Sequence, residues 1–230
     1  MVKQFEGTAE HVARRFAEVR ERVAEAAGEA GRAGDEVEIL VATKYVAPET
    51  MAVLRQAGVR LVGENRAQDL VAKHELFGDA FVYDFIGHLQ SRKVKLVLPL
   101  VRLIHSVSTL SVVQELQARA QNPVQVLLEV NVGGEDTKSG VELGEVDAFL
   151  GQAAAADKVE FAGLMCMPPL FDDPERAAPY FERTKQLADD LSGRWAGRYT
   201  FGQLSMGTSA DYEVAVRHGA TIVRVGSVLF

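Results

Sequence analysis

Two patterns of hydrophobic positions alternate along most of the chain. Short runs rich in β-branched residues predict strands at 38–43, 59–63, 82–87, 101–107, 124–132, 159–165, 200–205 and 221–225. Between them, apolar residues recur every three or four positions, which predicts helices at 49–57, 66–76, 112–120, 145–155, 176–191 and 211–218. Residues 91–98 form a weaker helical pattern, because their last positions are strongly apolar.

The start of the chain predicts a helix of its own. Its apolar positions follow one another at spacings of four and three, with charged residues between them: Val12, Phe16, Val19, Val23 and Ala26. Gly31 and Gly34 are expected to end this helix.

The alternation of strands and helices predicts a parallel sheet. Eight strand patterns favour closure into a (β/α)8 TIM barrel with an extra N-terminal helix, and a doubly wound open sheet is the alternative. Little chain follows the last strand, so the N-terminal helix is expected to take the place of the missing outer helix. Linkers, repeats and low-complexity tracts are not apparent, so residues 1–230 are predicted to form one domain.

Composition narrows the class of protein. Hydrophobic residues make up 47% of the chain, which is typical of a globular fold. The net charge of −7 argues against attraction of the whole chain to nucleic acid or to an anionic membrane. The single cysteine, Cys166, excludes an intramolecular disulfide, and His88 and His105 lack the spacing of a metal motif. Neither a signal peptide nor a bilayer-spanning run is apparent, so we predict a cytoplasmic protein without a metal.

The loops that follow the strands carry the chemistry in either architecture. Lys44 follows the first strand, where removal from water favours the neutral, nucleophilic amine, although a lysine at a strand end can also simply snorkel. Asn65 follows the second strand and is a candidate ligand contact or a cap of the next helix. Met165, near the end of the sixth strand, is a candidate pocket wall or a core residue.

The last two strand ends predict a phosphate site. Ser205 and Gly207 follow the seventh strand, ahead of a helix start, and Gly226 and Ser227 follow the eighth. An ordinary helix cap by Ser209 is the plainer interpretation of the first of these segments. Arg224 lies inside an apolar strand, where a guanidinium requires a partner. A phosphorylated aldehyde cofactor would satisfy the lysine, the phosphate cradle and the arginine together.

Other polar segments have less specific interpretations. Arg92 and Lys93 fit a basic rim or a solvated helix face, with the second favoured. The glycine-rich loop 133–140 fits an active-site loop or a surface turn.

The combination of short motifs resembles the pyridoxal phosphate homeostasis protein family, whose barrel is similar to the barrel domain of alanine racemase. The motifs occur in the family's order over nearly the whole chain: Lys44, Gly63-Glu64-Asn65, Phe85-Ile86-Gly87, Leu89-Gln90, Asn131, Gly163-Leu164-Met165, Leu204-Ser205-Met206-Gly207 and Arg224-Val225-Gly226. Three positions depart from the family's pattern and bear on contacts at the rim: Thr43 where Ser is common, Arg92 where Asn is common, and Thr208 where a larger residue often occurs.

The resemblance implies roles for individual residues. It implies that pyridoxal 5′-phosphate (PLP) forms a Schiff base with Lys44 and that Arg224 meets the pyridine nitrogen. It places Asn65 near the ring and Met165 in the pocket wall. It assigns the phosphate to these residues: Ser205, Gly207, Gly226 and Ser227.

The resemblance also implies a PLP carrier or regulator, with no settled catalytic reaction, that supplies apo PLP-dependent enzymes. We expect a monomer. One alternative is a single-domain PLP-dependent amino-acid racemase, which would need a second acid or base from Tyr45, His88 or another subunit. Another is a phosphosugar-type barrel enzyme that uses Lys44 without a cofactor.

Overall fold

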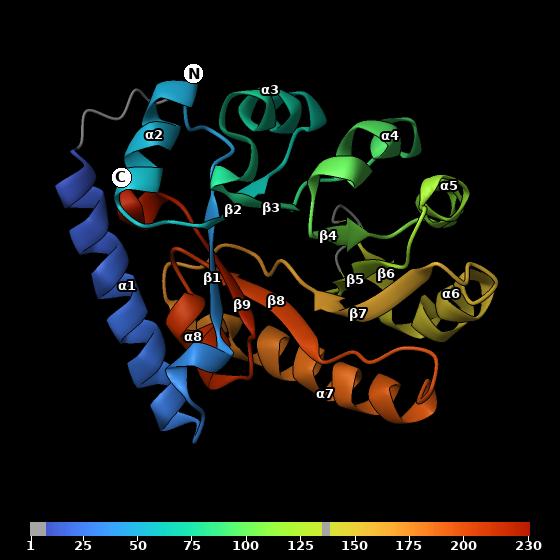
Figure 1. Ribbon diagram of the computed structural model, residues 1–230. Coiled ribbons are helices and arrows are strands. Elements are labelled where there is room, and N and C mark those ends of the chain that lie inside the picture. The colour runs from blue at the N-terminus through green and yellow to red at the C-terminus, as the bar shows by residue number, and fades with distance from the viewer. Residues whose placement is uncertain (1–7, 135–138) are drawn as a thin grey trace.

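The computed structural model describes residues 8–134 and 139–230, and it shows a closed barrel of parallel strands surrounded by helices (Figure 1). Eight strands form the ring in the order β1-β2-β3-β4-β5-β7-β8-β9, and β9 pairs with β1 to complete it. Their bounds are β1 Glu38–Ala42, β2 Leu61–Glu64, β3 Val82–Phe85, β4 Leu103–Val107, β5 Val124–Asn131, β7 Val159–Met165, β8 Gln203–Thr208 and β9 Ile222–Val225. The predicted TIM barrel is therefore confirmed, and the open sheet is not observed.

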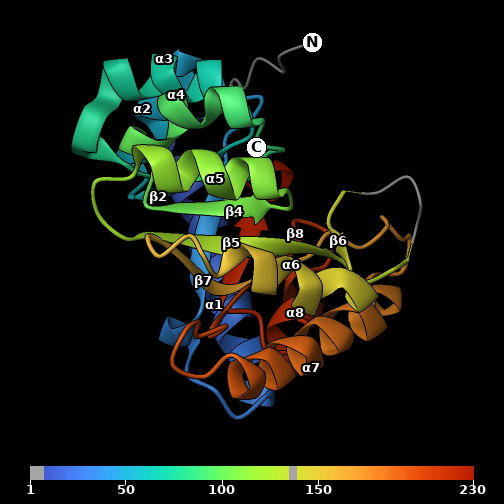
Figure 2. The same cartoon turned by 90° about the vertical axis from the view of Figure 1, so that its right-hand side faces the viewer.

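The strands run in one direction, so their carboxyl ends gather at one mouth of the barrel. Figure 2 shows β4 and β5 side by side with their arrowheads pointing the same way. A short additional strand, β6 (Val141–Glu142), pairs with β5 outside the ring. The sequence did not predict β6, because a segment of this length shows no recognisable period.

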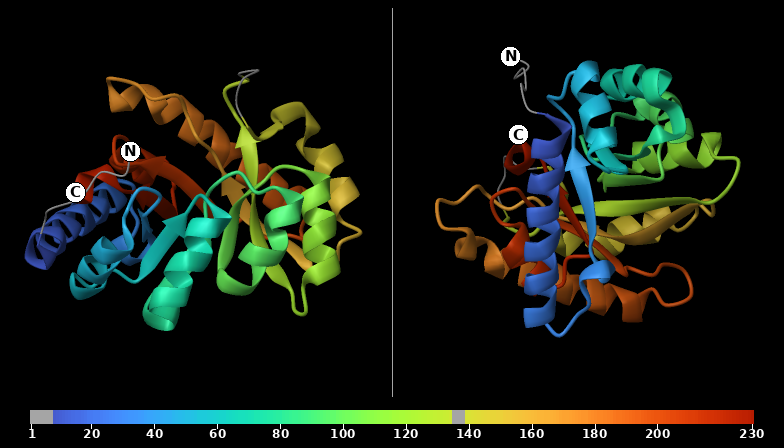
Figure 3. Two further views of the ribbon diagram at one scale, coloured as in Figure 1. Left: turned by 90° about the horizontal axis from the view of Figure 1, so that it is seen from above. Right: turned by 60° about the vertical axis from the view of Figure 1, so that its left-hand side comes forward.

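Helices cover the outside of the barrel, as the view from above shows (Figure 3). Their bounds are α2 Pro48–Gln56, α3 Ala67–Phe77, α4 Val94–Val97, α5 Leu110–Arg119, α6 Val146–Ala153, α7 Ala178–Arg194 and α8 Tyr212–Arg217. The weak pattern at 91–98 is only one α-helical turn, and 3-10 turns precede and follow it. Pro99 lies in the second of these turns, where the missing N–H of a proline disfavours continuation of an α-helix.

The barrel has two apolar regions. One lies between the strands and the helices and includes the large buried side chains Phe85, Phe161 and Phe181. The other is formed by strand residues alone and fills the barrel interior: Leu40, Leu103, Leu127, Ala162, Met165 and Ile222. The interior is thus a packed core, and polar side chains that share it need partners.

The N-terminal helix α1 (Ala9–Glu29) occupies the place of the helix that would follow the last strand. It packs between α2 and α8, as the right-hand view of Figure 3 shows. Arg15 Nε donates to the carbonyl of Val228 at 3.1 Å, and Arg32 Nη1 donates to that of Ala220 at 2.9 Å. The prediction that α1 completes the outer ring is confirmed.

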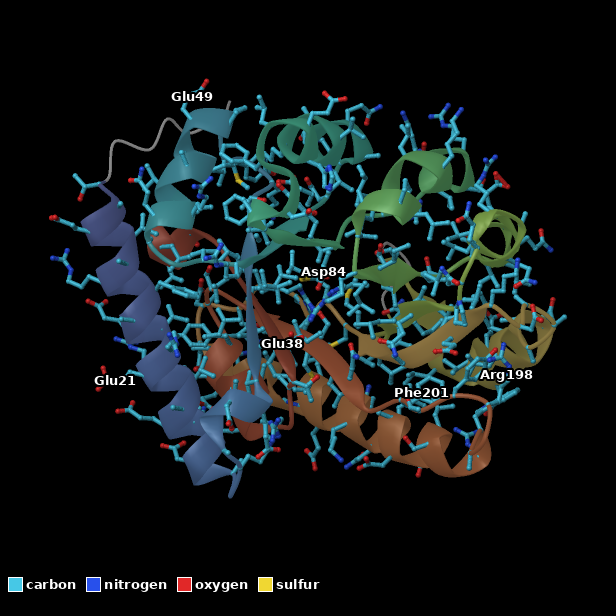
Figure 4. The ribbon with its side chains drawn as sticks, in the orientation of Figure 1. Glu21, Glu38, Glu49, Asp84, Arg198 and Phe201 are labelled. Atoms are coloured by element: carbon cyan, nitrogen blue, oxygen red, sulfur yellow. The ribbon has the colours of Figure 1, made fainter. Side chains whose placement is uncertain are left out.

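We expect the apolar face of α1 to be needed for stability. In the pair Val19→Ala and Val23→Ala, four buried methyl-sized groups are lost, which lowers the free energy of unfolding by about 3 kcal/mol. The matched pair Glu21→Ala and Glu25→Ala changes exposed positions, and Glu21 points outward in Figure 4, so it should leave stability within about 0.5 kcal/mol. Chemical denaturation measures the free energy of unfolding of both double variants. Equal losses in the two would contradict this role of α1. A chain lacking residues 1–30 that is as stable and soluble as the whole protein would contradict it too.

Strand β8 differs most from its prediction. The sequence placed it at 200–205, whereas it runs from Gln203 to Thr208. A bulge shifts its register against β9, since Ser205 pairs with Ile222 and Thr208 pairs with Arg224. Gly207 lies in this bulge with φ of +89°, and a Cβ there would meet the Ala215 Cβ at 2.6 Å. The serine and glycine that suggested a turn are therefore part of the strand, because pairing with β9 overrides their weak strand propensity.

Candidate functional site

Four neighbouring strands bring the predicted ligand residues to the mouth of the barrel. Because β8, β9, β1 and β2 are adjacent, the segments after them lie next to one another. Val41 pairs with Val225 and Ala42 pairs with Gly63, so Lys44 follows β1 between the loop at Gly226 and the loop at Asn65. Around the mouth, the loops after β8 and β9 therefore come first, Lys44 follows, and Asn65 comes next.

Lys44 itself lies in a turn beyond the end of β1, and its side chain is exposed. Its Nζ lies 5.4 Å from the centre of the Tyr45 ring. The expectation that Lys44 is removed from water is wrong for this structure, because β1 ends at Ala42 and the lysine is no longer enclosed by neighbouring strands. An exposed amine at the mouth is accessible to a ligand that enters from solvent.

The backbone just before Lys44 is held by a buried ion pair. Lys73, from α3, donates from Nζ to Glu64 Oε1 at 2.5 Å and to the Thr43 carbonyl at 2.7 Å. Thr43 also donates from its hydroxyl to Glu64. Burial raises the pKa of Glu64, while the charge and hydrogen bond of Lys73 and the hydrogen bond of Thr43 act in the opposite direction. This cluster anchors the start of the turn that carries Lys44, and the sequence had not identified it.

Asn65 follows β2 and does not cap α3, whose N-cap residue is Arg66. Its Oδ1 is buried, and among the described residues it has no hydrogen-bond partner. A buried amide oxygen without a partner is unfavourable unless a ligand or water satisfies it. Gly87 keeps the end of β3 close by, since a Cβ there would lie 2.2 Å from the Asn65 carbonyl oxygen. The capping interpretation of Asn65 is therefore wrong, and a ligand contact remains.

Arg224 projects into the barrel from β9 and is only 4% exposed. Its Nη1 donates to Ser205 Oγ at 2.5 Å, and its Nη2 donates to the Cys166 carbonyl at 2.9 Å and approaches the sulfur of Met167 at 3.8 Å. Burial lowers the pKa of Arg224, and the negative charges of Asp211 and Glu129 act in the opposite direction. The partners that satisfy this buried guanidinium are thus a hydroxyl, a carbonyl and a thioether.

The loops after β8 and β9 are joined to each other by Ser209. Its Oγ accepts from the Gly226 N–H at 2.8 Å, so it does not act as the helix cap that the plainer interpretation predicted. Asp211 Oδ1 accepts from the N–H of Thr208 at 2.6 Å and from its hydroxyl at 2.9 Å. Ser227 is exposed at the start of a 3-10 turn, Ser227–Leu229. The Ser209–Gly226 hydrogen bond therefore joins the loop after β8 to the loop after β9, next to the exposed Ser227.

Ser205 lies deeper than expected. Because β8 extends to Thr208, Ser205 is a mid-strand residue with no exposed surface. Its Oγ accepts from Arg224 and lies 2.8 Å from Nδ1 of His105. Met165 is also buried, at 3% exposure, and packs with the interior residues. Of the predicted site residues, Ser205, Met165 and Arg224 therefore form the floor, and Lys44, Asn65, Gly226 and Ser227 surround the mouth.

Three further polar residues lie below Arg224, and sequence reasoning had assigned them no role. His105 Nε2 lies 3.0 Å from Asp84 Oδ2, and Arg102 donates to both oxygens of Asp84 at 3.0 and 2.7 Å. Figure 4 shows Asp84 at the centre of the molecule, between the strands. The sequence feature that could have identified Asp84 and His105 is a polar residue inside an apolar strand. Such a residue needs a hydrogen-bond partner when it is buried.

The remaining candidates lie at the rim. His88 and Arg92 are exposed, and Arg92 Nε donates to Gln90 Oε1 at 2.9 Å, which fits a solvated face. Residues 135–138 of the loop 133–140 lie outside the described residues, while Ser139 contacts Glu129 of β5. Within residues 8–134 and 139–230 we find no group of three acidic, histidine or cysteine residues placed to hold a metal ion. The helices in these ranges include none that is long and apolar enough to cross a bilayer.

Fold and site together define a class: single (β/α)8 barrels that carry a lysine after the first strand and a buried arginine on the last. The family described as "Alanine racemase, N-terminal domain" matches residues 8–230. The chain belongs to this family.

Individual relatives are similar over nearly their whole length. The chain is 40% identical to the pyridoxal phosphate homeostasis protein of Aquifex aeolicus, covering 94% of this chain and 96% of that protein. It is 31% identical to the protein of the same name from Escherichia coli K12, with 95% of each covered.

Solved structures show the same fold. PipY of Synechococcus elongatus PCC7942, whose structure contains bound PLP, superposes with a TM-score of 0.82 at 26% identity, covering 95% of this chain and 99% of PipY. Alanine racemase from Corynebacterium glutamicum has a TM-score of 0.67 at 12% identity, and 97% of this chain covers 60% of that enzyme. At this identity the second likeness concerns the fold alone.

Proposed function

We propose that this protein binds PLP covalently on Lys44 and serves in PLP homeostasis as a cytoplasmic carrier or regulator. The single observation that carries the proposal is the placement of Lys44 beside the joined loops at Ser209 and Gly226, with Arg224 beneath them in the barrel. The names of the curated relatives and the PLP bound to PipY support the same ligand for this chain. PLP supplies an aldehyde that condenses with a lysine amine with loss of one water.

The residues around the mouth fit PLP. Asn65 offers a buried amide oxygen that has no partner among the described residues, so a polar edge of the ligand would remove an unfavourable feature. The joined loops at Ser209, Gly226 and Ser227 offer hydroxyl and backbone groups of the kind that binds phosphate. Arg224 stays a cation because a guanidinium begins with a pKa far above neutrality, so it would donate to the pyridine nitrogen of bound PLP without protonating it.

The phosphate contacts differ in one respect from the sequence expectation. The Ser205 hydroxyl is engaged by Arg224 and His105 inside the barrel, while Ser209 lies in the joined loops and accepts from Gly226, which leaves its own hydrogen available for donation. We therefore assign the side-chain contact with phosphate to Ser209 and Ser227. Gly207 contributes through the bulge of β8, Gly226 through its N–H bond to Ser209, and Ser205 by holding Arg224.

A carrier fits the site better than a racemase. An unprotonated pyridine nitrogen is a weak electron sink, which disfavours the carbanion chemistry of racemisation. A racemase also needs a second acid or base on the opposite face of its substrate. The exposed His88 and Tyr45 lie on open surface, where water surrounds them. We further propose that the protein is a monomer and that apo PLP-dependent enzymes are the recipients of its cofactor.

The test is an absorbance scan of the purified protein, followed by incubation with L- and D-alanine. We expect an absorption band of lysine-bound PLP, a spectral change on addition of amino acid, and no accumulation of the opposite enantiomer. Racemisation at an enzymatic rate would favour the alternative. A protein that shows no band even after incubation with PLP would refute the proposed function.

A further inference from the structure

A continuous line of hydrogen-bonded polar groups crosses the barrel interior from the buried Arg224 to the exposed opposite end. Arg224 contacts Ser205, Ser205 contacts His105, and His105 contacts Asp84. Arg102 then links Asp84 to Glu38, the first residue of β1, with Nη1 at 2.5 Å from Glu38 Oε1. Ser205, His105 and Asp84 have no exposed surface, so water does not replace the contacts among them, whereas Arg102 and Glu38 lie at the exposed end of the line.

The charge state of Asp84 follows from its partners. Burial by itself would raise the pKa of Asp84, but hydrogen bonds from His105 and Arg102 outweigh it and hold this pKa below its ordinary value. Asp84 is therefore a carboxylate, which can only accept hydrogen bonds.

The proton on His105 can be placed by the same reasoning. Burial lowers the pKa of His105, so the ring is neutral and carries one N–H. That N–H is on Nε2, because the Asp84 carboxylate can only accept and an unprotonated Nε2 at 3.0 Å would turn a lone pair toward its oxygen. Nδ1 is then an acceptor, and the Ser205 hydroxyl donates to it.

One direction of hydrogen bonding follows for the whole line. Arg224 donates to the Ser205 oxygen, Ser205 donates to His105, and His105 donates to Asp84. The Ser205 hydroxyl has only one hydrogen, so its orientation is decided by His105. The lone pairs of the Ser205 oxygen then face Arg224 and accept from its Nη1. The Cys166 carbonyl accepts from its Nη2.

We propose that His105 and Asp84 are positioning residues, which act through Ser205 to fix the plane of the Arg224 guanidinium against bound PLP. This inference rests on the proposed function, because it needs PLP at Arg224. It goes beyond the proposed function, because His105 and Asp84 act on Arg224 through Ser205 and not by contact with PLP. Without the acceptor at His105 Nδ1, the Ser205 hydroxyl is free to rotate. Its hydrogen can then point toward Arg224, where it displaces the lone pair that accepts from Nη1.

Two variants of His105 separate this role from a structural one. The side-chain oxygen of Asn occupies the region of Nδ1, so His105→Asn keeps an acceptor for Ser205 and gives up the contact with Asp84. The amide nitrogen of Gln reaches the region of Nε2, so His105→Gln keeps a donor for Asp84 and gives up the contact with Ser205. Each variant keeps one of two buried hydrogen bonds, so a purely structural role predicts similar losses in both.

The experiment measures PLP affinity by absorbance titration, the absorption maximum of bound PLP, and the melting temperature of each protein without PLP. We expect His105→Gln to weaken PLP binding roughly tenfold, about 1.4 kcal/mol, and to shift the absorption maximum. His105→Asn should stay within about twofold of the unchanged protein, while both variants lower the melting temperature to a similar degree. Ser205→Ala removes only one oxygen atom, and it should match His105→Gln in affinity and spectrum.

The outcomes are distinguishable. If the unchanged protein binds no PLP, the proposed function fails. If it binds PLP, and His105→Gln and His105→Asn have equal affinities and spectra, the positioning role is overturned while the proposed function stands. If neither His105 variant folds, Ser205→Ala decides, and unchanged affinity and spectrum in that variant overturn the inference.

Discussion

Lys44→Ala is expected to abolish covalent retention of PLP. Without the amine at this position, borohydride should fix no cofactor to the protein, and the absorption band of lysine-bound PLP should disappear. The joined loops at Ser209 and Gly226 and the guanidinium of Arg224 remain, so weak binding is expected to persist. We expect affinity to fall on the order of a hundredfold, about 2.8 kcal/mol. Peptide mass spectrometry after reduction and an equilibrium titration measure the two effects.

Lys95→Ala is the matched control, since Lys95 is an exposed lysine of α4 outside the mouth. It should leave affinity, spectrum and the site of reduction unchanged. Lys44 is exposed and carries no buried contact, so its replacement should not lower the melting temperature of the protein without PLP. Recovery of the reduced label on another lysine, or on none, in the unchanged protein would refute the assignment.

Arg224→Glu is expected to have the second largest effect. It removes the proposed donor for the pyridine nitrogen and places a carboxylate beneath the proposed phosphate site. A hydrogen bond to a charged group contributes about 1.5–3 kcal/mol, so PLP affinity should fall roughly tenfold to a hundredfold. A carboxylate also invites a proton onto the pyridine nitrogen, which strengthens the ring as an electron sink. The PLP that still binds should therefore react faster with amino acids.

The contacts of Arg224 indicate which further effects Arg224→Glu and Arg224→Lys should have. Because the partners of Arg224 are Ser205 and the Cys166 carbonyl, a carboxylate at position 224 faces acceptor atoms and should also lower the melting temperature. Arg224→Lys keeps the charge but not the planar fork, so its effects should be smaller in the same direction. A destabilised Arg224→Glu protein with unaltered PLP affinity and spectrum would remove Arg224 from the site.

Some residues of this site could be predicted from the sequence, and others could not. Lys44 and Arg224 were identifiable because a lysine at a strand end and an arginine inside an apolar strand are both unusual. Asn65 remained ambiguous, because capping and ligand binding use the same residue type. Ser205 and Ser209 both differ from their expected roles, since a shift of three residues in β8 moved Ser205 into the barrel and Ser209 bonds to Gly226 and does not cap a helix.

The line through Asp84 and His105 was not predictable. These residues are 21 positions apart in the chain, and each by itself is a polar residue inside an apolar strand, which indicates that a partner is needed but not which one. Similarly, Lys73 belongs to the helix pattern at 66–76, and nothing in that pattern indicates that it reaches back to Thr43 and Glu64. Contacts of this kind depend on which side chains barrel closure brings together.

By itself, the sequence determined the class of fold, the number and order of the barrel strands, the role of the N-terminal helix and the residue types available for PLP. These features follow from local periodicity, which each segment carries independently of its partners. Only the tertiary structure decided which hydroxyl faces the mouth, which one holds Arg224, and how a buried histidine and carboxylate support it. The physical reason is register: pairing between β8 and β9 through a bulge at Gly207 selects the face on which each side chain lies, and a strand's own pattern does not specify that pairing.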